Sequence, residues 1–130
     1  MPFDWREFLV IAHGLRSDHS EGARRTSLGR SYYYIYNLGL KKARALHFKG
    51  KLPGLHRQLW DWCQNHTDPN IRQLGVDGLR MHSFRIQADY DAAPIPNLAF
   101  EVTRQLARAQ TFEALVARSN GQQPPPTLTP

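Results

Sequence analysis

The sequence predicts a single all-α domain, an antiparallel bundle of about five helices. Apolar residues recur at spacings of three and four along most of the chain, which is the period of one helix face. Clusters of Gly, Pro, Asn and Asp separate these periodic segments, and no segment has the alternating pattern of a strand. With 130 residues, 41% of them hydrophobic, the chain is long enough to form one core.

The first two predicted helices cover about residues 4–16 and 21–48. The apolar face of the first consists of Trp5, Phe8, Leu9, Ala12 and Leu15. Asp4 and Glu7 have the spacing of a capping box at its start. In the second, Gly29 and Gly39 each cost about 1 kcal/mol relative to Ala. Either another element approaches closely at these glycines or the helix is interrupted, and we favour close packing.

The third and fourth predicted helices follow the break at FKGKLPG. The third is short and runs from Leu55 to about Asn65. Asp68 and Pro69 form the N-cap and first-turn pair of the fourth helix, which ends at AAPIPN. Its apolar face consists of Ile71, Leu74, Gly78, Met81 and Ala88. Arg85 is in line with this face, and an arginine there is costly to bury without partners, so we expect a dimer seam or a cleft beside it.

Asn97 is the predicted cap of the last helix, which extends to about residue 118. Its apolar positions are Leu98, Val102, Leu106, Ala109, Phe112 and Val116. The helical bundle therefore covers residues 1–118. The Pro-rich, polar tail over residues 119–130 is expected to be disordered.

Charge and composition narrow the class of partner. The chain has 17 Lys and Arg against 11 Asp and Glu, a formal charge of +6, which favours RNA or an acidic protein. The lone Cys63 and the scattered histidines have no zinc-ligand spacing, and no Gly-rich phosphate loop is present, so no metal or cofactor is predicted. The start PFDWRE does not have the pattern of a signal peptide, and no apolar run approaches the roughly 20 residues of a membrane span. We expect a cytoplasmic protein without membrane contact.

Two segments resemble small stand-alone HEPN proteins (higher eukaryotes and prokaryotes nucleotide-binding). In ARRTSLGRSYYYIYNLGLKKA, an arginine precedes a tyrosine pair and an aromatic residue follows one turn later. These positions are Arg30, Tyr32, Tyr33 and Tyr36. In RIQADYD, Arg85 is followed by Asp89 and Tyr90, which is similar to the Arg, three residues, Asp, Tyr pattern of the same branch. The two segments lie in the family's order, and the resemblance covers about residues 5–118.

The resemblance implies a dimeric helical bundle, often encoded beside a minimal nucleotidyltransferase in toxin and antitoxin or antiphage pairs. Many members are metal-independent ribonucleases, whose signature is an Arg, four to six residues, then a His near a two-fold interface. In this chain four residues separate Arg85 from Tyr90, so a tyrosine occupies the position of the family's histidine. No other arginine in the chain is followed, after four residues, by a histidine.

Metal-free RNA cleavage needs a base, an acid and a cation for the phosphate. Arg85 is the candidate cation and Asp89 the residue that orients it. Tyr90, with an ordinary pKa near 10, is a poor base but a hydrogen-bond donor, and His82 is the nearby imidazole that could substitute. Arg30, Tyr33 and Arg80 are the candidate nucleic-acid contacts.

Each feature also has a purely structural interpretation. Arg85 and Asp89 have the spacing of an intrahelical ion pair, the tyrosine run is typical of a core, and His82 is typical of a solvent-facing position. The other histidines form no constellation: His13, His19, His47, His56 and His66. The basic pairs are expected on solvated faces: Arg24 with Arg25, and Lys41 with Lys42.

Two hypotheses about function follow. In the first, the protein is a HEPN-type, RNA-directed toxin or antiphage defence component with weak or no metal-independent ribonuclease activity. In the second, it is a non-catalytic dimeric scaffold that docks a nucleotidyltransferase or another effector. The tyrosine in place of the histidine favours the second, and the basic charge favours the first.

Overall fold

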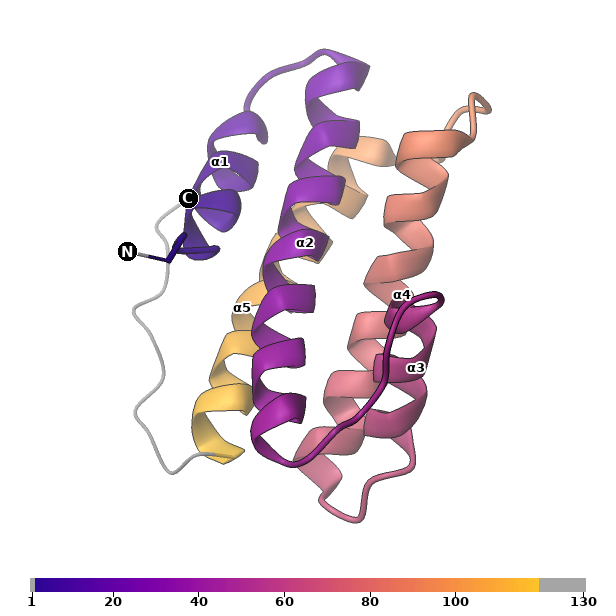
Figure 1. Ribbon diagram of the computed structural model, residues 1–130. Helices are drawn as coiled ribbons and strands as arrows, with labels where there is room; N and C mark the ends of the chain where they lie inside the picture. The colour runs from indigo at the N-terminus through magenta and orange to yellow at the C-terminus, as the bar shows by residue number, and fades with distance from the viewer. Residues whose placement is uncertain (1, 120–130) are drawn as a thin grey trace.

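The computed structural model describes residues 2–119 and confirms the all-α bundle (Figure 1). Its five helices are α1 (Arg6–Leu15), α2 (Glu21–Ala45), α3 (Leu55–Gln64), α4 (Pro69–Tyr90) and α5 (Leu98–Ser119), and the described residues contain no strand. Because α5 extends to Ser119, the helical part is one residue longer than predicted. The rest of the predicted tail, residues 120–130, lies outside the described residues.

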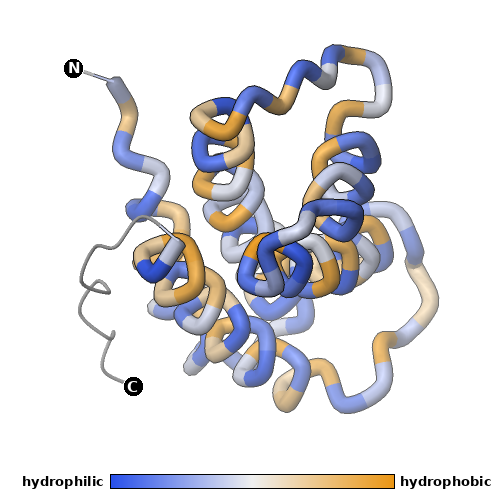
Figure 2. Tube along the Cα trace, turned by 90° about the horizontal axis from the view of Figure 1, so that it is seen from below, coloured by the Kyte–Doolittle hydropathy of each residue, from blue (hydrophilic) through white to orange (hydrophobic). Residues whose placement is uncertain are grey.

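Helix α2 lies at the centre of the bundle. It packs against α1, α4 and α5, and α3 packs mainly against α4. Helices α1 and α4 run antiparallel to α2, whereas α5 runs in the same direction as α2 (Figure 1). Seen end-on in Figure 2, each helix alternates between hydrophobic and hydrophilic residues, as helices with one buried face should.

Glycines allow three helices to meet at the fully buried Trp60 of α3. A Cβ added at Gly78 of α4 would come within 2.5 Å of the Trp60 ring, and one at Gly75 would lie 2.8 Å from the Trp60 carbonyl oxygen. On the α2 side, a Cβ at Gly39 would lie 3.1 Å from Trp60 and 3.0 Å from Phe112. The predicted close packing at Gly39 is confirmed, and α2 continues without interruption through it.

The helix ends partly follow the predicted caps. Asp68 caps α4 as predicted, because its carboxylate accepts a hydrogen bond from the Asn70 N–H at 2.8 Å. At α1 the Asp4 carboxylate accepts from the Arg6 N–H, but the helix begins at Arg6 rather than residue 4 and no capping box forms among the described bonds. Helix α2 stops at Ala45 because His47 adopts a left-handed backbone with φ of 74°.

The remaining cap differs from the prediction in geometry. Helix α5 begins at Leu98, directly after Asn97, as predicted. However, Asn97 has a left-handed φ of 54°, and the bond it contributes runs from the Glu101 N–H to the Asn97 carbonyl oxygen at 2.9 Å. An N-cap residue ordinarily has an extended backbone, so Asn97 starts the helix through its own carbonyl.

The C-terminus of α4 is held against α2 by Arg25. Its guanidinium donates to four carbonyl oxygens at distances of 2.6 to 3.3 Å, those of Gln87, Ala88, Asp91 and Ala93. The predicted solvated position of Arg25 is therefore wrong, and so is that of Lys42, which is 8% exposed. A cation at a helix C-terminus satisfies carbonyls that have no partner within the helix. This contact fixes the last turns of α4, where Arg85, Asp89 and Tyr90 lie.

None of the described helices is long and apolar enough to cross a membrane.

Candidate functional site

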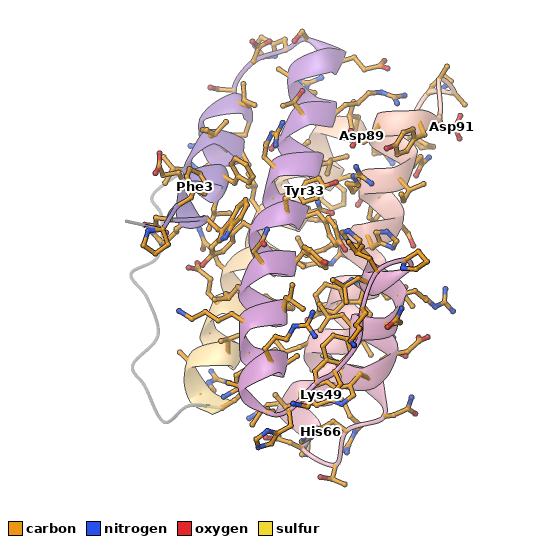
Figure 3. The ribbon with its side chains drawn as sticks, in the orientation of Figure 1. Phe3, Tyr33, Lys49, His66, Asp89 and Asp91 are labelled. Atoms are coloured by element: carbon orange, nitrogen blue, oxygen red, sulfur yellow. The ribbon has the colours of Figure 1, made fainter. Side chains whose placement is uncertain are left out.

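Arg85 lies in the seam between α2 and α4, enclosed by two tyrosine rings. Its guanidinium carbon is 4.9 Å from the centre of the Tyr33 ring on α2 and 5.3 Å from that of Tyr90 on α4. Its Nε is 2.9 Å from an oxygen of Asp89, one turn further along α4. The side chain is only 13% exposed. Figure 3 shows Tyr33 and Asp89 at the α2 and α4 sides of this seam.

The hydrogen bonds of Arg85 are largely unmade. The contact with Asp89 does not have hydrogen-bond geometry, and Nε is buried without a partner. The two terminal nitrogens have no hydrogen-bond partner among residues 2–119, but they are not among the buried polar atoms, so they reach solvent. The two tyrosine rings cover the flat faces of the guanidinium and leave its terminal N–H groups open to solvent. This geometry suits the binding of a carboxylate or phosphate.

A stack of aromatic rings adjoins Arg85 on the α3 side. The rings of His82 on α4 and His56 on α3 have centres 5.2 Å apart and are nearly parallel, at 12°. Tyr36 of α2 also stacks on His56, at 3.9 Å and 15°. Three helices therefore contribute one ring each to a continuous stack.

Buried hydroxyl and indole groups hold His56 in this stack. The Tyr32 hydroxyl lies 2.6 Å from Nδ1 of His56, and the indole N–H of Trp60 donates to the same hydroxyl at 3.1 Å. Tyr32 and Trp60 are fully buried. The position of His56 thus depends on the packing of α2 against α3 at Trp60. We term Tyr33, His56, His82, Arg85, Asp89 and Tyr90 the Arg85 site.

The electrostatic environment keeps both imidazoles neutral at pH 7. Burial lowers the pKa of His56 to about 4, and the charges of His82 and Arg85 add to this effect. Burial also lowers the pKa of His82, with further contributions from Arg85 and Arg57. Burial raises the pKa of Tyr32 well above its ordinary value. The Arg85 site therefore combines one permanent cation with two neutral imidazoles, and these have the protonation state that a base requires.

A lowered histidine pKa makes stability depend on pH. The unfolded chain binds a proton near pH 6.5 whereas folded His56 does so only near pH 4, so stability is complete above pH 6.5 and falls as the pH drops through this window. We expect a loss of about 1 to 2 kcal/mol from His56, allowing for solvent screening. Urea unfolding of wild type and His56→Gln at pH 7, 6, 5 and 4.5 measures this, and equal slopes against pH would refute it.

The structure brings five of the seven predicted site residues together: Tyr33, His82, Arg85, Asp89 and Tyr90. The other two lie elsewhere. Arg30 is exposed and packs over the Phe8 ring of α1 at 4.8 Å, and Arg80 lines a groove on the outer side of α4. His82 is half-buried rather than solvent-facing, so that interpretation of His82 is wrong. The Arg85 and Asp89 pair exists as an ion pair, at the edge of the site.

His56 is the site residue that the sequence did not reveal. It was expected to belong to no constellation, yet it contacts Tyr32, Tyr36 and His82. Its spacing of four from Trp60 placed both on one face of α3, but that spacing does not say which helix the face meets. The contact depends on Gly75 and Gly78 letting α3 lie close to α4.

Within residues 2–119, no three His, Cys, Asp or Glu side chains come together as a metal site. No family model matches the chain, and neither a curated protein nor a solved structure matches it significantly.

Proposed function

We propose that the protein is an RNA-directed toxin or antiphage defence component of the HEPN type that binds RNA phosphates at the Arg85 site. The observation that carries this proposal is the open edge of Arg85. Its terminal nitrogens lack protein partners among the described residues, while Tyr33 and Tyr90 cover its faces. The formal charge of +6 favours a polyanion as the ligand.

The surrounding side chains suit an RNA strand better than a small carboxylate. The rings of Tyr33 and Tyr90 border the guanidinium, and the Tyr90 side is open because this residue is 72% exposed. Exposed aromatic rings beside a cation provide a surface on which bases stack while the cation contacts the phosphate. We infer that the Arg85 site contacts one phosphate and a neighbouring base of a single strand.

Cleavage by the wild-type site should be weak or absent. Tyr90 occupies the position of the HEPN family's histidine, and a phenol is a poorer general base than an imidazole. Of the two imidazoles, Nδ1 of His56 is occupied by the Tyr32 hydroxyl, whereas His82 makes no hydrogen bond among the described residues. His82 is therefore the better candidate for any residual base catalysis.

A homodimer with α4 at or near its interface remains part of the proposal. Val76 and Ile86 on α4 are 47% and 40% exposed, and a second chain would cover such apolar residues. The burial of Arg85 does not support the dimer, however, because α2 of the same chain already covers it. The dimer argument therefore rests on the exposed apolar residues alone.

A second function, a non-catalytic scaffold that docks a nucleotidyltransferase or another effector, is favoured by a different surface. A groove of about 480 Å³ follows the outer side of α4 next to the end of α3. It is lined by Gln64, Val76, Leu79, Arg80, Ser83, Phe84 and Gln87. Such a mixed apolar and basic surface fits a protein partner better than a base-specific contact.

RNA binding by Arg85→Ala tests the proposed function. A hydrogen-bonded ion contact is worth about 1.5 to 3 kcal/mol, so we expect the substitution to weaken binding of a short single-stranded RNA by about 10- to 100-fold. Lys49→Ala is the matched control, because it removes the same charge at the opposite end of the bundle (Figure 3). Fluorescence anisotropy with labelled RNA measures both. Equal affinities of wild type and Arg85→Ala would leave the scaffold as the better account.

A further inference from the structure

The hydrogen bonds around His56 run in one direction only. The indole nitrogen of Trp60 can donate but not accept, so the Tyr32 oxygen is the acceptor in that bond. The hydrogen of the Tyr32 hydroxyl is then available for Nδ1 of His56, 2.6 Å away. Because the imidazole is neutral at pH 7, Nδ1 accepts this hydrogen and the ring's own hydrogen is on Nε2. The buried chain from Trp60 through Tyr32 therefore selects one tautomer of His56.

This tautomer presents an N–H donor at the surface of the Arg85 site. Nε2 of His56 has no hydrogen-bond partner among residues 2–119 and is not among the buried polar atoms, so it reaches solvent. The same holds for both ring nitrogens of His82. The terminal nitrogens of Arg85 are unpaired in this range as well. These polar atoms around one stack of rings therefore have no hydrogen-bond partner among the described residues.

The groups around the two imidazoles are cationic or neutral. From α3 the facing group is Arg57, from α4 it is Arg85, and α2 contributes only tyrosines, namely Tyr32, Tyr33 and Tyr36. The nearest carboxylate in the site, Asp89, follows Arg85 by one turn and pairs with its Nε. Arg57 is likewise paired with a carboxylate of its own helix, Asp61. An anion entering between Arg85 and the imidazoles would therefore meet these donors, while the two nearby carboxylates are already engaged with the Nε atoms of Arg85 and Arg57.

We propose that His56 and His82 are part of the phosphate-binding site: His56 donates its Nε2–H to a phosphate oxygen, and His82 takes up a proton when the phosphate binds. The proton on His82 comes from water, and the bound anion compensates for the repulsion by Arg85 and Arg57. Phosphate affinity then rises as the pH falls towards the lowered titration range of His82. This inference rests on the proposed function, because it places the ligand at the Arg85 site. It goes further by naming the side-chain atoms that bind the phosphate, the tautomer of His56 and the pH dependence of phosphate affinity.

Imidazole ¹⁵N NMR of the full chain tests the proposal directly. In wild type at pH 7 we expect the His56 resonances of a ring protonated on Nε2 only. Addition of inorganic phosphate should shift the His56 and His82 signals and raise the titration midpoint of His82. A ribodinucleotide with one phosphodiester, used in a parallel titration, distinguishes a free phosphate from an RNA phosphate as the ligand.

Tyr32→Phe is the variant that isolates the tautomer. It removes the hydroxyl but keeps the buried ring, so we expect a mixture of His56 tautomers and phosphate binding about 3- to 10-fold weaker, the worth of one hydrogen bond. His82→Gln, at a half-buried position, is the second variant; it should abolish the pH dependence of dinucleotide affinity between pH 7 and 5, a range in which the phosphodiester does not itself titrate. Lys49→Ala should leave both readouts unchanged.

The outcomes separate this inference from the proposed function. A wild-type His56 protonated on Nδ1, or imidazole signals that do not respond to phosphate or dinucleotide, would overturn the inference, even if Arg85→Ala still weakened RNA binding. Conversely, imidazoles that respond to inorganic phosphate in a protein with no RNA affinity would support the phosphate site and contradict the RNA function. Retention of full pH dependence in His82→Gln would assign the proton to another group and refute the role of His82.

Discussion

Gly78→Ala is expected to destabilise the protein by up to about 2 kcal/mol, although alanine is the better helix former. The new methyl group would come within 2.5 Å of the Trp60 ring, which is fully buried and hydrogen-bonded to Tyr32. Trp60 has little room to move aside, because its backbone lies close against Gly75 of α4 and its ring packs edge-on against Phe112. Overpacking of this kind costs about 1 to 3 kcal/mol and occasionally more, which exceeds the helix-propensity gain of about 1 kcal/mol.

Gly14→Ala is the matched control. Gly14 also lies inside a helix, but a Cβ there meets nothing within 4 Å. The same substitution should therefore stabilise the protein by up to about 1 kcal/mol. Urea unfolding at pH 7 compares the two variants with wild type. A Gly78→Ala variant as stable as Gly14→Ala would show that α3 and α4 are less closely packed than the structure has them, and would also weaken the placement of His56.

Tyr90→His is expected to create or raise metal-independent RNA cleavage by about 100-fold or more. The substitution gives the chain the Arg, four residues, His spacing of HEPN ribonucleases, and it replaces a phenol by an imidazole, the side chain best suited to acid–base catalysis at neutral pH. General acid–base catalysis contributes about 10²- to 10⁴-fold. The position can accept the change, because Tyr90 is 72% exposed and ends α4.

The double variant Arg85→Ala with Tyr90→His is the control for this gain. Without this guanidinium the phosphate charge that builds during cleavage loses the cation beside residue 90, so the gain should disappear. Tyr90→Phe removes only a hydroxyl and should change RNA affinity by no more than about 1.5 kcal/mol. Labelled RNA incubated in EDTA and separated on a gel reports all three variants. Cleavage that persists in the double variant would place the active group outside the Arg85 site.

Helical periodicity was sufficient to predict the bundle. Most of each apolar face predicted from spacing is buried in the structure, for example Leu9 and Ala12 of α1 and Leu106 and Phe112 of α5. Trp5, predicted on the face of the first helix, is instead 41% exposed and precedes α1. The ends of the helices were less predictable. The end of α2, for example, depends on the left-handed backbone of His47. The role of Arg25 was missed for a similar reason, because its four carbonyl partners are more than 60 residues away in the sequence.

The candidate site was predictable where its residues are neighbours on one helix. Arg85, Asp89 and Tyr90 lie within two turns of α4, and their spacing alone placed them together. Tyr33 was identified only through the HEPN resemblance, and His56 was not identified at all. Its partners come from α2 and α4, and their contact with α3 is set by glycines, whose role in close packing a single sequence does not specify.

The central claim is that Arg85 contacts an RNA phosphate, and the salt dependence of RNA affinity tests it most directly. Each phosphate contact to a single strand releases counterions and contributes about −0.7 to the slope of log affinity against log salt. Wild type and Arg85→Ala should be titrated with one labelled RNA at several salt concentrations, with Lys49→Ala in parallel. We predict that Arg85→Ala binds more weakly and that its slope is shallower by about 0.7. An unchanged slope and affinity in Arg85→Ala would contradict the phosphate contact.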